Sequence, residues 1–114
     1  MEKILTDILP NLKYPIIMAP MFLVTDEKMM IEATKNGVAP AIPALNYRSI
    51  DEFKAGIQSI KSQAKGPFGI NLIVNKSNPL YHQQLKTCCE IGVDFIITSL
   101  GNPLKTIQMA HKNN

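Results

Sequence analysis

The chain alternates between short, continuous runs of apolar residues and longer segments in which apolar positions recur every three or four residues. The continuous runs show little polar alternation. That is typical of strands buried on both faces of a parallel sheet. The pattern predicts four such strands, over residues 15–19, 38–42, 68–74 and 93–98.

The segments between the runs have the spacing of amphipathic helices. We predict a first helix over residues 26–35, with Met29, Met30 and Ala33 facing inward. A second helix starts at Ser49, which has Glu52 three residues later and so forms a capping-box signature. Its apolar positions fall on one helical face: Ile50, Phe53, Ile57, Ile60 and Ala64.

Two Asn-Pro pairs predict the starts of the last two helices. At 78–79 and at 102–103, an amide side chain that can cap a helix precedes a proline suited to the first helical position. The inward stripe of the third helix is predicted to be Tyr81, Leu85, Cys88 and Cys89. In the fourth helix the stripe begins with Leu104 and Ile107.

Glycine marks the return from helix to strand. Gly37, Gly66 and Gly92 each follow a predicted helix, and we expect each to take the left-handed conformation that closes a helix at low cost. The strand–helix–glycine unit recurs at roughly 22 to 30 residues, the size of a βα unit. The sequence therefore predicts an α/β protein with four βα units in a parallel sheet, following a leader over residues 1–14.

Length and composition agree with a single folded unit over residues 1–114. The chain is 46% hydrophobic and 18% charged, which argues against disorder. No apolar run is long enough to span a bilayer, and the first residues lack the apolar stretch of a secretion signal. We expect a soluble, cytoplasmic protein that does not associate with membranes.

The basic residues do not form a nucleic-acid surface. The net charge is +3, but eleven of the twelve cations are lysines spread along the chain, and Arg48 is the remaining one. Nucleic-acid surfaces favour a clustered basic stripe with arginines and aromatic residues, and aromatic residues make up 6% here. We expect no nucleic-acid partner.

The two cysteines, Cys88 and Cys89, are adjacent. A bridge between neighbours closes no useful loop, and the sequence has neither a Cys-x-x-Cys pair nor paired histidines at metal-binding spacing. We expect reduced thiols and no metal site.

Candidate chemistry is expected at the carboxyl ends of the strands, where βα proteins bind ligands. The loops there span residues 19–22, 43–46, 71–75 and 99–102. They hold no histidine, no glycine-rich phosphate-binding motif and no obvious nucleophile–base pair. The sequence thus identifies no catalytic residue, and His82 and His111 are predicted to be surface residues of helices.

Asn71 is the most informative polar residue at these strand ends, because it interrupts an apolar strand. A buried amide without partners costs about 1–3 kcal/mol, and the neighbouring Gly69 permits a close approach by another group. A polar ligand and an internal hydrogen bond to a neighbouring strand both explain Asn71. Other strand-end residues likewise have both a structural and a ligand-binding interpretation: Ala19, Pro20, Met21, Ser99 and Asn102.

Three segments in this order and spacing resemble the nitronate monooxygenases, formerly called 2-nitropropane dioxygenases. They are Pro15-Ile-Ile-Met-Ala-Pro-Met21, Phe68-Gly-Ile-Asn-Leu72 and Thr98-Ser-Leu-Gly-Asn-Pro103. Members of this family are FMN-dependent (β/α)8 barrels that oxidise alkyl nitronates with molecular oxygen, giving a carbonyl compound and nitrite. The resemblance runs from about Tyr14 onward and implies the N-terminal half of such a TIM barrel.

The resemblance also implies roles for individual residues. Ala19, Pro20 and Met21 would contact the flavin ring, Asn71 would hydrogen-bond the flavin or its ribityl chain, and Ser99 would approach the same cavity. Residues 36–43 carry prolines where the family commonly has glycines, which suggests a divergent branch. The family's catalytic histidine and main phosphate-binding loops lie beyond the fourth strand, and His111 does not match that histidine.

Three functions stay open at this point. The first is FMN-dependent nitronate oxidation, with an alkyl nitronate and oxygen as substrates and this chain by itself expected to have little activity. The second is another FMN-barrel oxidoreductase, such as an enoyl reductase or an NAD(P)H:quinone reductase. The third is a non-catalytic half-barrel that forms a homodimer, since four parallel strands leave two open edges.

Overall fold

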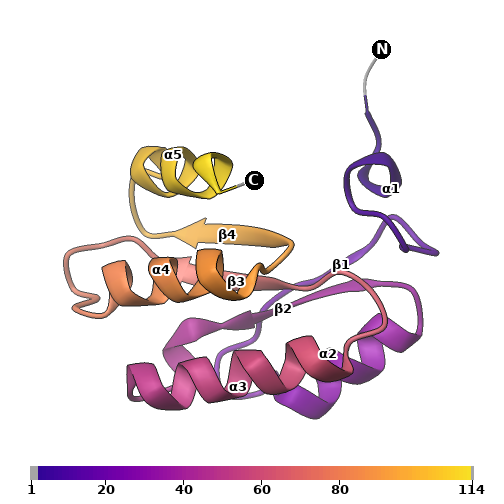
Figure 1. The fold of residues 1–114 in the computed structure, drawn as a ribbon, viewed down its shortest axis with the longest axis horizontal. Coiled ribbons are helices and arrows are strands. Elements are labelled where there is room, and N and C mark those ends of the chain that lie inside the picture. Colours follow the sequence, from indigo (N-terminus) through magenta and orange to yellow (C-terminus); the bar gives the residue numbers. More distant parts are fainter. Residues whose placement is uncertain (1–2, 114) are drawn as a thin grey trace.

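The computed structural model describes residues 3–113 and contains a four-stranded parallel sheet in the order β1-β2-β3-β4 (Figure 1). Each strand pairs in parallel with the strand before it in the chain. The elements are α1 (Leu5–Ile8), β1 (Ile17–Met18), α2 (Glu27–Lys35), β2 (Ala39–Pro43), η1 (Ala44–Asn46), α3 (Ile50–Gln63), β3 (Gly69–Ile73), α4 (Tyr81–Ile91), β4 (Phe95–Ser99) and α5 (Leu104–Lys112).

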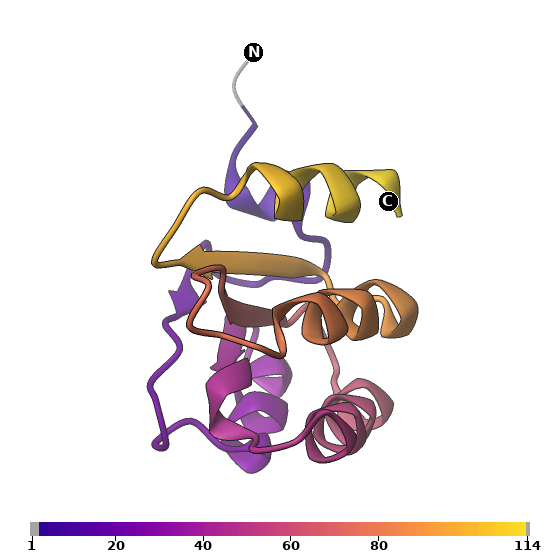
Figure 2. The same cartoon turned by 90° about the vertical axis from the view of Figure 1, so that its left-hand side faces the viewer.

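The predicted α/β architecture with four βα units is confirmed. A helix follows each strand, and helices α2 to α5 form an arc around one side of the sheet (Figure 2). The four strands were located to within about two residues by their apolar runs, although β1 is shorter than the predicted 15–19. The leader contains the short helix α1, which the sequence pattern did not indicate and which lies apart from the other helices (Figure 1).

The hydrophobic core lies between the sheet and helices α2, α3 and α4. Strand side chains alternate between two faces, and the alternate positions Ile42, Ile70 and Leu72 join the core cluster. The helices complete it with large, fully or nearly fully buried side chains: Met30, Phe53, Ile57, Ile60, Leu85 and Cys88. Continuous apolar strands therefore supply one side of the core, and the helical stripes supply the other.

The opposite face of the sheet is built around a close contact between β3 and β4. Gly69 pairs with Phe95 in the parallel register, and the Phe95 ring lies where a Cβ on Gly69 would sit, at 2.3 Å. Because strand positions two apart share a face, Asn71 lies on this same face, one step closer to the carboxyl end of β3. Gly69 thus admits an aromatic ring beside the strand that carries Asn71.

The Ser49 cap predicted for α3 is present. Ser49 Oγ accepts a hydrogen bond from the Glu52 N–H at 3.1 Å, and Glu52 Oε2 accepts one from the Arg48 N–H at 3.3 Å. The carboxylate therefore reaches one residue further back than in the usual capping box. At α2, Asp26 caps in the same manner, accepting from Met29 N–H at 2.8 Å.

Removing the α3 cap tests this helix start. Ser49→Ala should lower the free energy of unfolding by about 1 kcal/mol, because the Glu52 N–H loses its acceptor. Urea denaturation followed by circular dichroism measures the change. The matched control is Ser62→Ala in the last turn of the same helix, where an exposed hydroxyl bonds only to its own helix. Equal effects of the two substitutions would contradict a capping role for Ser49.

The predicted start of α4 is wrong by two residues and that of α5 by one. The helices begin at Tyr81 and Leu104, so neither proline occupies the first helical position. The asparagines instead form local turns, in which Asn78 Oδ1 accepts from the Leu80 N–H and Asn102 Oδ1 accepts from the Leu104 N–H. The Asn78 bond satisfies the backbone donor directly before α4, and the Asn102 bond satisfies that of the first residue of α5.

The left-handed conformation expected at three glycines is present at two of them. Gly37 and Gly92 have φ of 82° and 83°. Gly66 is not in the left-handed region, and the prediction for it is wrong because α3 ends in an extended residue, Ala64. A Cβ at Gly66 would approach the Thr34 carbonyl oxygen to 3.4 Å, so the backbone of this loop passes close to the end of α2.

The inward stripe predicted for α5 is also wrong at its first positions. Leu104 and Ile107 are 54% and 44% exposed. Thr106 is the buried residue of this helix, and its hydroxyl shares a hydrogen bond of 2.6 Å with the Tyr81 hydroxyl of α4. The helix therefore packs on α4 through a polar contact, while two of its apolar residues face solvent.

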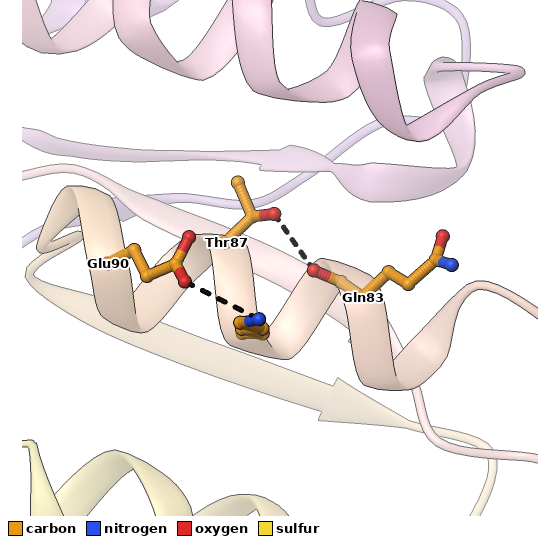
Figure 3. Close-up of polar contacts among 4 residues, drawn as sticks. Gln83, Thr87 and Glu90 are labelled. Carbon is orange, nitrogen blue, oxygen red and sulfur yellow. Dashed lines mark hydrogen bonds and ion pairs between the residues drawn. The ribbon is translucent and has the colours of Figure 1, made fainter.

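Polar contacts on α4 are local to that helix (Figure 3). Thr87 Oγ1 donates to the Gln83 carbonyl at 2.8 Å, and Lys86 pairs with Glu90 one turn later at 3.8 Å. The lysine and glutamate side chains are largely exposed, so this ion pair adds a few tenths of a kcal/mol to the helix at most. The group stabilises α4 and has no geometry of a binding site.

Candidate functional site

The carboxyl ends of the four parallel strands lie at one end of the sheet, and two predicted site residues meet there. Asn71 lies in β3 and Ser99 is the last residue of β4. The Asn71 Nδ2 group donates to Ser99 Oγ at 2.8 Å and to the Ile97 carbonyl oxygen at 3.0 Å. The strands thus bring together two polar side chains that are 28 residues apart in sequence.

Of the two interpretations that the sequence left open for Asn71, the internal hydrogen bond is present, and the polar ligand stays a prediction. The Asn71 amide nitrogen bonds to β4, which confirms the internal hydrogen bond. Its Oδ1 accepts no hydrogen bond from any residue in 3–113, and the side chain is half-buried. An acceptor is therefore held at the end of the sheet and is open to a donor from outside the chain.

The loop after β1 carries Ala19, Pro20 and Met21 at the same end of the sheet. Ala19 and Met21 are exposed and Pro20 is half-buried. The loop curls back on itself, because the Met21 N–H donates to Thr25 Oγ1 at 2.9 Å. The Met21 side chain is therefore available to a ligand, while its backbone donor is already used.

Asn46, the last residue of η1, fixes this loop and was not singled out from the sequence. Its Oδ1 accepts from the Leu23 N–H at 2.8 Å, and its Nδ2 donates to the Thr25 carbonyl at 2.9 Å. Leu23 has a φ of 59°, a left-handed conformation that is uncommon outside glycine. The signal available in the sequence was an amide side chain in a strand-end loop, directly after β2.

The five predicted residues do not all touch one another. Asn71 and Ser99 are in contact, whereas Ala19, Pro20 and Met21 follow β1, which is separated from β3 by β2. Their contact with a flavin stays a prediction. Together they offer an acceptor, a hydroxyl and an exposed thioether, all without charge. This set suits the uncharged ring of a flavin, whereas none of the five supplies a cation for a phosphate.

Strongly perturbed titratable groups lie away from these strand ends. The Tyr47 hydroxyl donates to Glu27 Oε2 at 3.1 Å, and burial together with that carboxylate raises the pKa of Tyr47 well above its usual value. The two residues line a surface hollow beside α3 together with Glu52 and Gly56. A phenol held protonated against a carboxylate ties the segment before α3 to the start of α2 and offers no acid or base near neutral pH.

The cysteines are unsuited to nucleophilic chemistry. Burial raises the pKa of Cys88 to about 12, so its thiol stays protonated at neutral pH. Desolvation and the adjacent Glu90 raise the pKa of Cys89 as well. Both thiols are free, as the sequence predicts. Because the thiolate is the reactive form, neither residue is a candidate nucleophile.

Within residues 3–113, no group of three or more His, Cys, Asp and Glu side chains is placed to hold a metal ion. His82 and His111 are exposed on α4 and α5, as predicted. None of the helices in this part of the chain has both the length and the apolar character needed to cross a membrane.

Solved structures of two proteins share this fold. The chain is similar to FabK from Thermotoga maritima, with 24% identity and a TM-score of 0.85 over 99% of this chain and 35% of that chain. It is also similar to nitroalkane oxidase from Streptomyces ansochromogenes, with 17% identity and a TM-score of 0.79 over 97% of this chain and 40% of that chain. No protein-family model matches the chain, and no curated protein matches its sequence.

These similarities establish the fold. The four-stranded α/β chain corresponds to a half TIM-barrel unit of both structures, as predicted from the strand and helix count. The chain spans well under half the length of either protein. The similarity therefore shows the fold of this part of a barrel and not the activity of a complete one.

Proposed function

We propose that this chain forms the N-terminal half of an FMN-dependent barrel enzyme that oxidises alkyl nitronates with molecular oxygen. The observation that carries the proposal is the Asn71–Ser99 pair, in which an amide from the middle of β3 reaches the last residue of β4 and leaves Asn71 Oδ1 free to accept. Ligands of βα barrels bind at this end of the sheet. The fold shared with nitroalkane oxidase supports the same assignment.

In this proposal the chain's residues bind and orient the flavin ring. Asn71 Oδ1 accepts a hydrogen bond from the flavin, Ser99 contributes its hydroxyl, and the exposed Met21 thioether packs against the apolar part of the ring. The redox chemistry of the conversion of an alkyl nitronate and oxygen to a carbonyl compound and nitrite would be supplied by FMN, while these residues would bind and orient it. Cations for the flavin phosphate come from outside these five residues.

Asn71→Ala is expected to weaken flavin binding to the chain by about tenfold, because one hydrogen bond to the ring is lost. Quenching of flavin fluorescence on titration with protein measures the dissociation constant. Riboflavin and FMN should bind with similar affinity, since the five candidate residues offer no cation to a phosphate. The control is Gln58→Ala, an exposed residue of α3, and equal affinities of the two variants would contradict the role of Asn71.

A second candidate function is another FMN-barrel oxidoreductase, such as an enoyl reductase or an NAD(P)H:quinone reductase. The observation that favours it is the greater similarity to FabK than to nitroalkane oxidase, in both identity and TM-score. The same flavin-binding residues serve either reaction, because the difference lies in the electron donor.

A chimaera separates the two candidates. This chain can replace the matching 40% of nitroalkane oxidase, whose remaining part completes the barrel. Oxygen uptake that depends on an alkyl nitronate supports the first candidate. Oxidation of NAD(P)H without nitronate turnover supports the second.

A further inference from the structure

We propose that the amino end of the sheet carries a binding site for a small polyanion with two or three negative charges, such as a triphosphate or a tricarboxylate. The site is a hollow of about 520 Å³, which lies within the size range of small-molecule pockets. Three lysines line it: Lys13, Lys35 and Lys65. The hollow lies at the opposite end of the strands from the candidate flavin site, so the proposal does not depend on the flavin function.

The fold brings together lysines that are far apart in the sequence. Lys13 lies shortly before β1, Lys35 shortly before β2 and Lys65 shortly before β3. Because these three strands are neighbours and run parallel, the residues that precede them meet at the amino end of the sheet. Lysines that are spread along the sequence therefore gather around one hollow in the structure.

Backbone hydrogen bonds fix the positions of the three lysines around the end of α2. The Lys13 N–H donates to the Gly37 carbonyl oxygen at 2.9 Å. The Lys65 N–H donates to Thr34 Oγ1 at 3.1 Å, and Lys35 is the last residue of α2. Gly37 has a φ of 82°, and a Cβ there would overlap the Lys13 side chain. The three backbone segments are thus held against one another.

The charges of these lysines are not compensated by the residues around the hollow. Within residues 3–113, none of the three ammonium groups forms an ion pair or a hydrogen bond. No Asp or Glu is among the described residues that line the hollow. The Glu32 carboxylate accepts instead from the Asn36 amide, at 3.3 Å.

The end of α2 does not need the lysines as caps. The Ala33 and Thr34 carbonyl oxygens already accept hydrogen bonds from backbone N–H groups. Three cations around one concave surface create a positive potential that attracts anions. A ligand with two or three negative charges matches this number of cations.

The first test maps the site on the unmodified chain. Tripolyphosphate and citrate are titrated separately at constant ionic strength, and ¹⁵N-edited NMR spectra are recorded. The amide signals of Gly37 and Gly66 should shift, whereas that of Gly92, which precedes β4 outside the hollow, should not. Shifts with both ligands support a general polyanion site, and shifts with one of them support a site restricted to phosphates or to carboxylates. If neither ligand shifts these signals, or if Gly92 shifts equally, the proposal is overturned.

The second test removes the charges. Replacing all three lysines of the hollow by glutamine should weaken tripolyphosphate binding by about thirtyfold, at about threefold for each exposed ion pair. The matched control replaces three exposed lysines outside the hollow, Lys54, Lys76 and Lys105, by glutamine, and should change the affinity by less than about twofold. Isothermal titration calorimetry measures the dissociation constants, and circular dichroism checks folding. Equal affinities of the two triple variants would overturn the site, because net charge alone would then explain binding. If the triple variant does not fold, the three single substitutions decide in the same way.

Discussion

Phe53→Ala is expected to lower the free energy of unfolding by about 3–5 kcal/mol, the largest effect that we anticipate for a single substitution. Phe53 is fully buried at the centre of the core between α3 and the sheet. Its ring also packs edge to face against Tyr47, with ring centroids 5.7 Å apart. Removing it leaves a cavity and deprives Tyr47 of the contact that holds it against the helix.

The loss should be visible as a lower midpoint of urea denaturation, with a folded baseline at low urea if the native stability exceeds the loss. Lys54→Ala is the matched control, since the next residue of the same helix is exposed. It should stay within about 0.5 kcal/mol of the wild type. A cost below about 1 kcal/mol for Phe53→Ala would contradict the placement of this ring in the core.

Gly69→Ala is expected to cost about 1–3 kcal/mol through overpacking, although it adds only a methyl group. An ideal Cβ at this position would lie 2.3 Å from the Phe95 ring, so strand β4 or the ring must move. The displacement occurs two residues from Asn71. The same substitution should therefore also weaken flavin binding, which the fluorescence titration would show.

A double-mutant cycle identifies the cause. In a Phe95→Ala background the clash is absent, and Gly69→Ala should cost little further stability. Gly66→Ala is the control glycine, because its φ is not left-handed and its nearest contacts begin at 3.4 Å. If Gly69→Ala costs the same with and without Phe95, the contact with the ring is not the reason for glycine at this position.

The sequence predicted the architecture because parallel strands leave continuous apolar runs. The expected burial on both faces is complete only in β2, since β4 is half-buried throughout and β1 is partly exposed. Residues 69–73 are apolar apart from Asn71, and the polar interruption itself identified the residue that now lies at the candidate site. The helix stripe of α3 was equally clear, since Phe53, Ile57 and Ile60 are all fully buried.

The sequence-based predictions failed where a side chain has several possible hydrogen-bonding or packing partners. Asn78 resembles a helix cap, but its amide donates to the Ile73 carbonyl and to Gln84 Oε1, and it ties the end of β3 to α4. Leu104 and Ile107 have helical spacing, yet spacing cannot tell whether a neighbouring element covers them. The role of Asn46 depends on a loop in which Leu23 has a left-handed conformation, and no local sequence pattern predicts that conformation.

The order of the strands in the sheet has a consequence for how the protein is made. Since β1, β2, β3 and β4 are neighbours in the same order as in the chain, each new strand can pair with the one synthesised just before it. No strand has to wait for a later one to be inserted beside it. The strands can therefore pair in the order in which they are translated, from β1 to β4. The Asn71–Ser99 contact forms last, when β4 emerges.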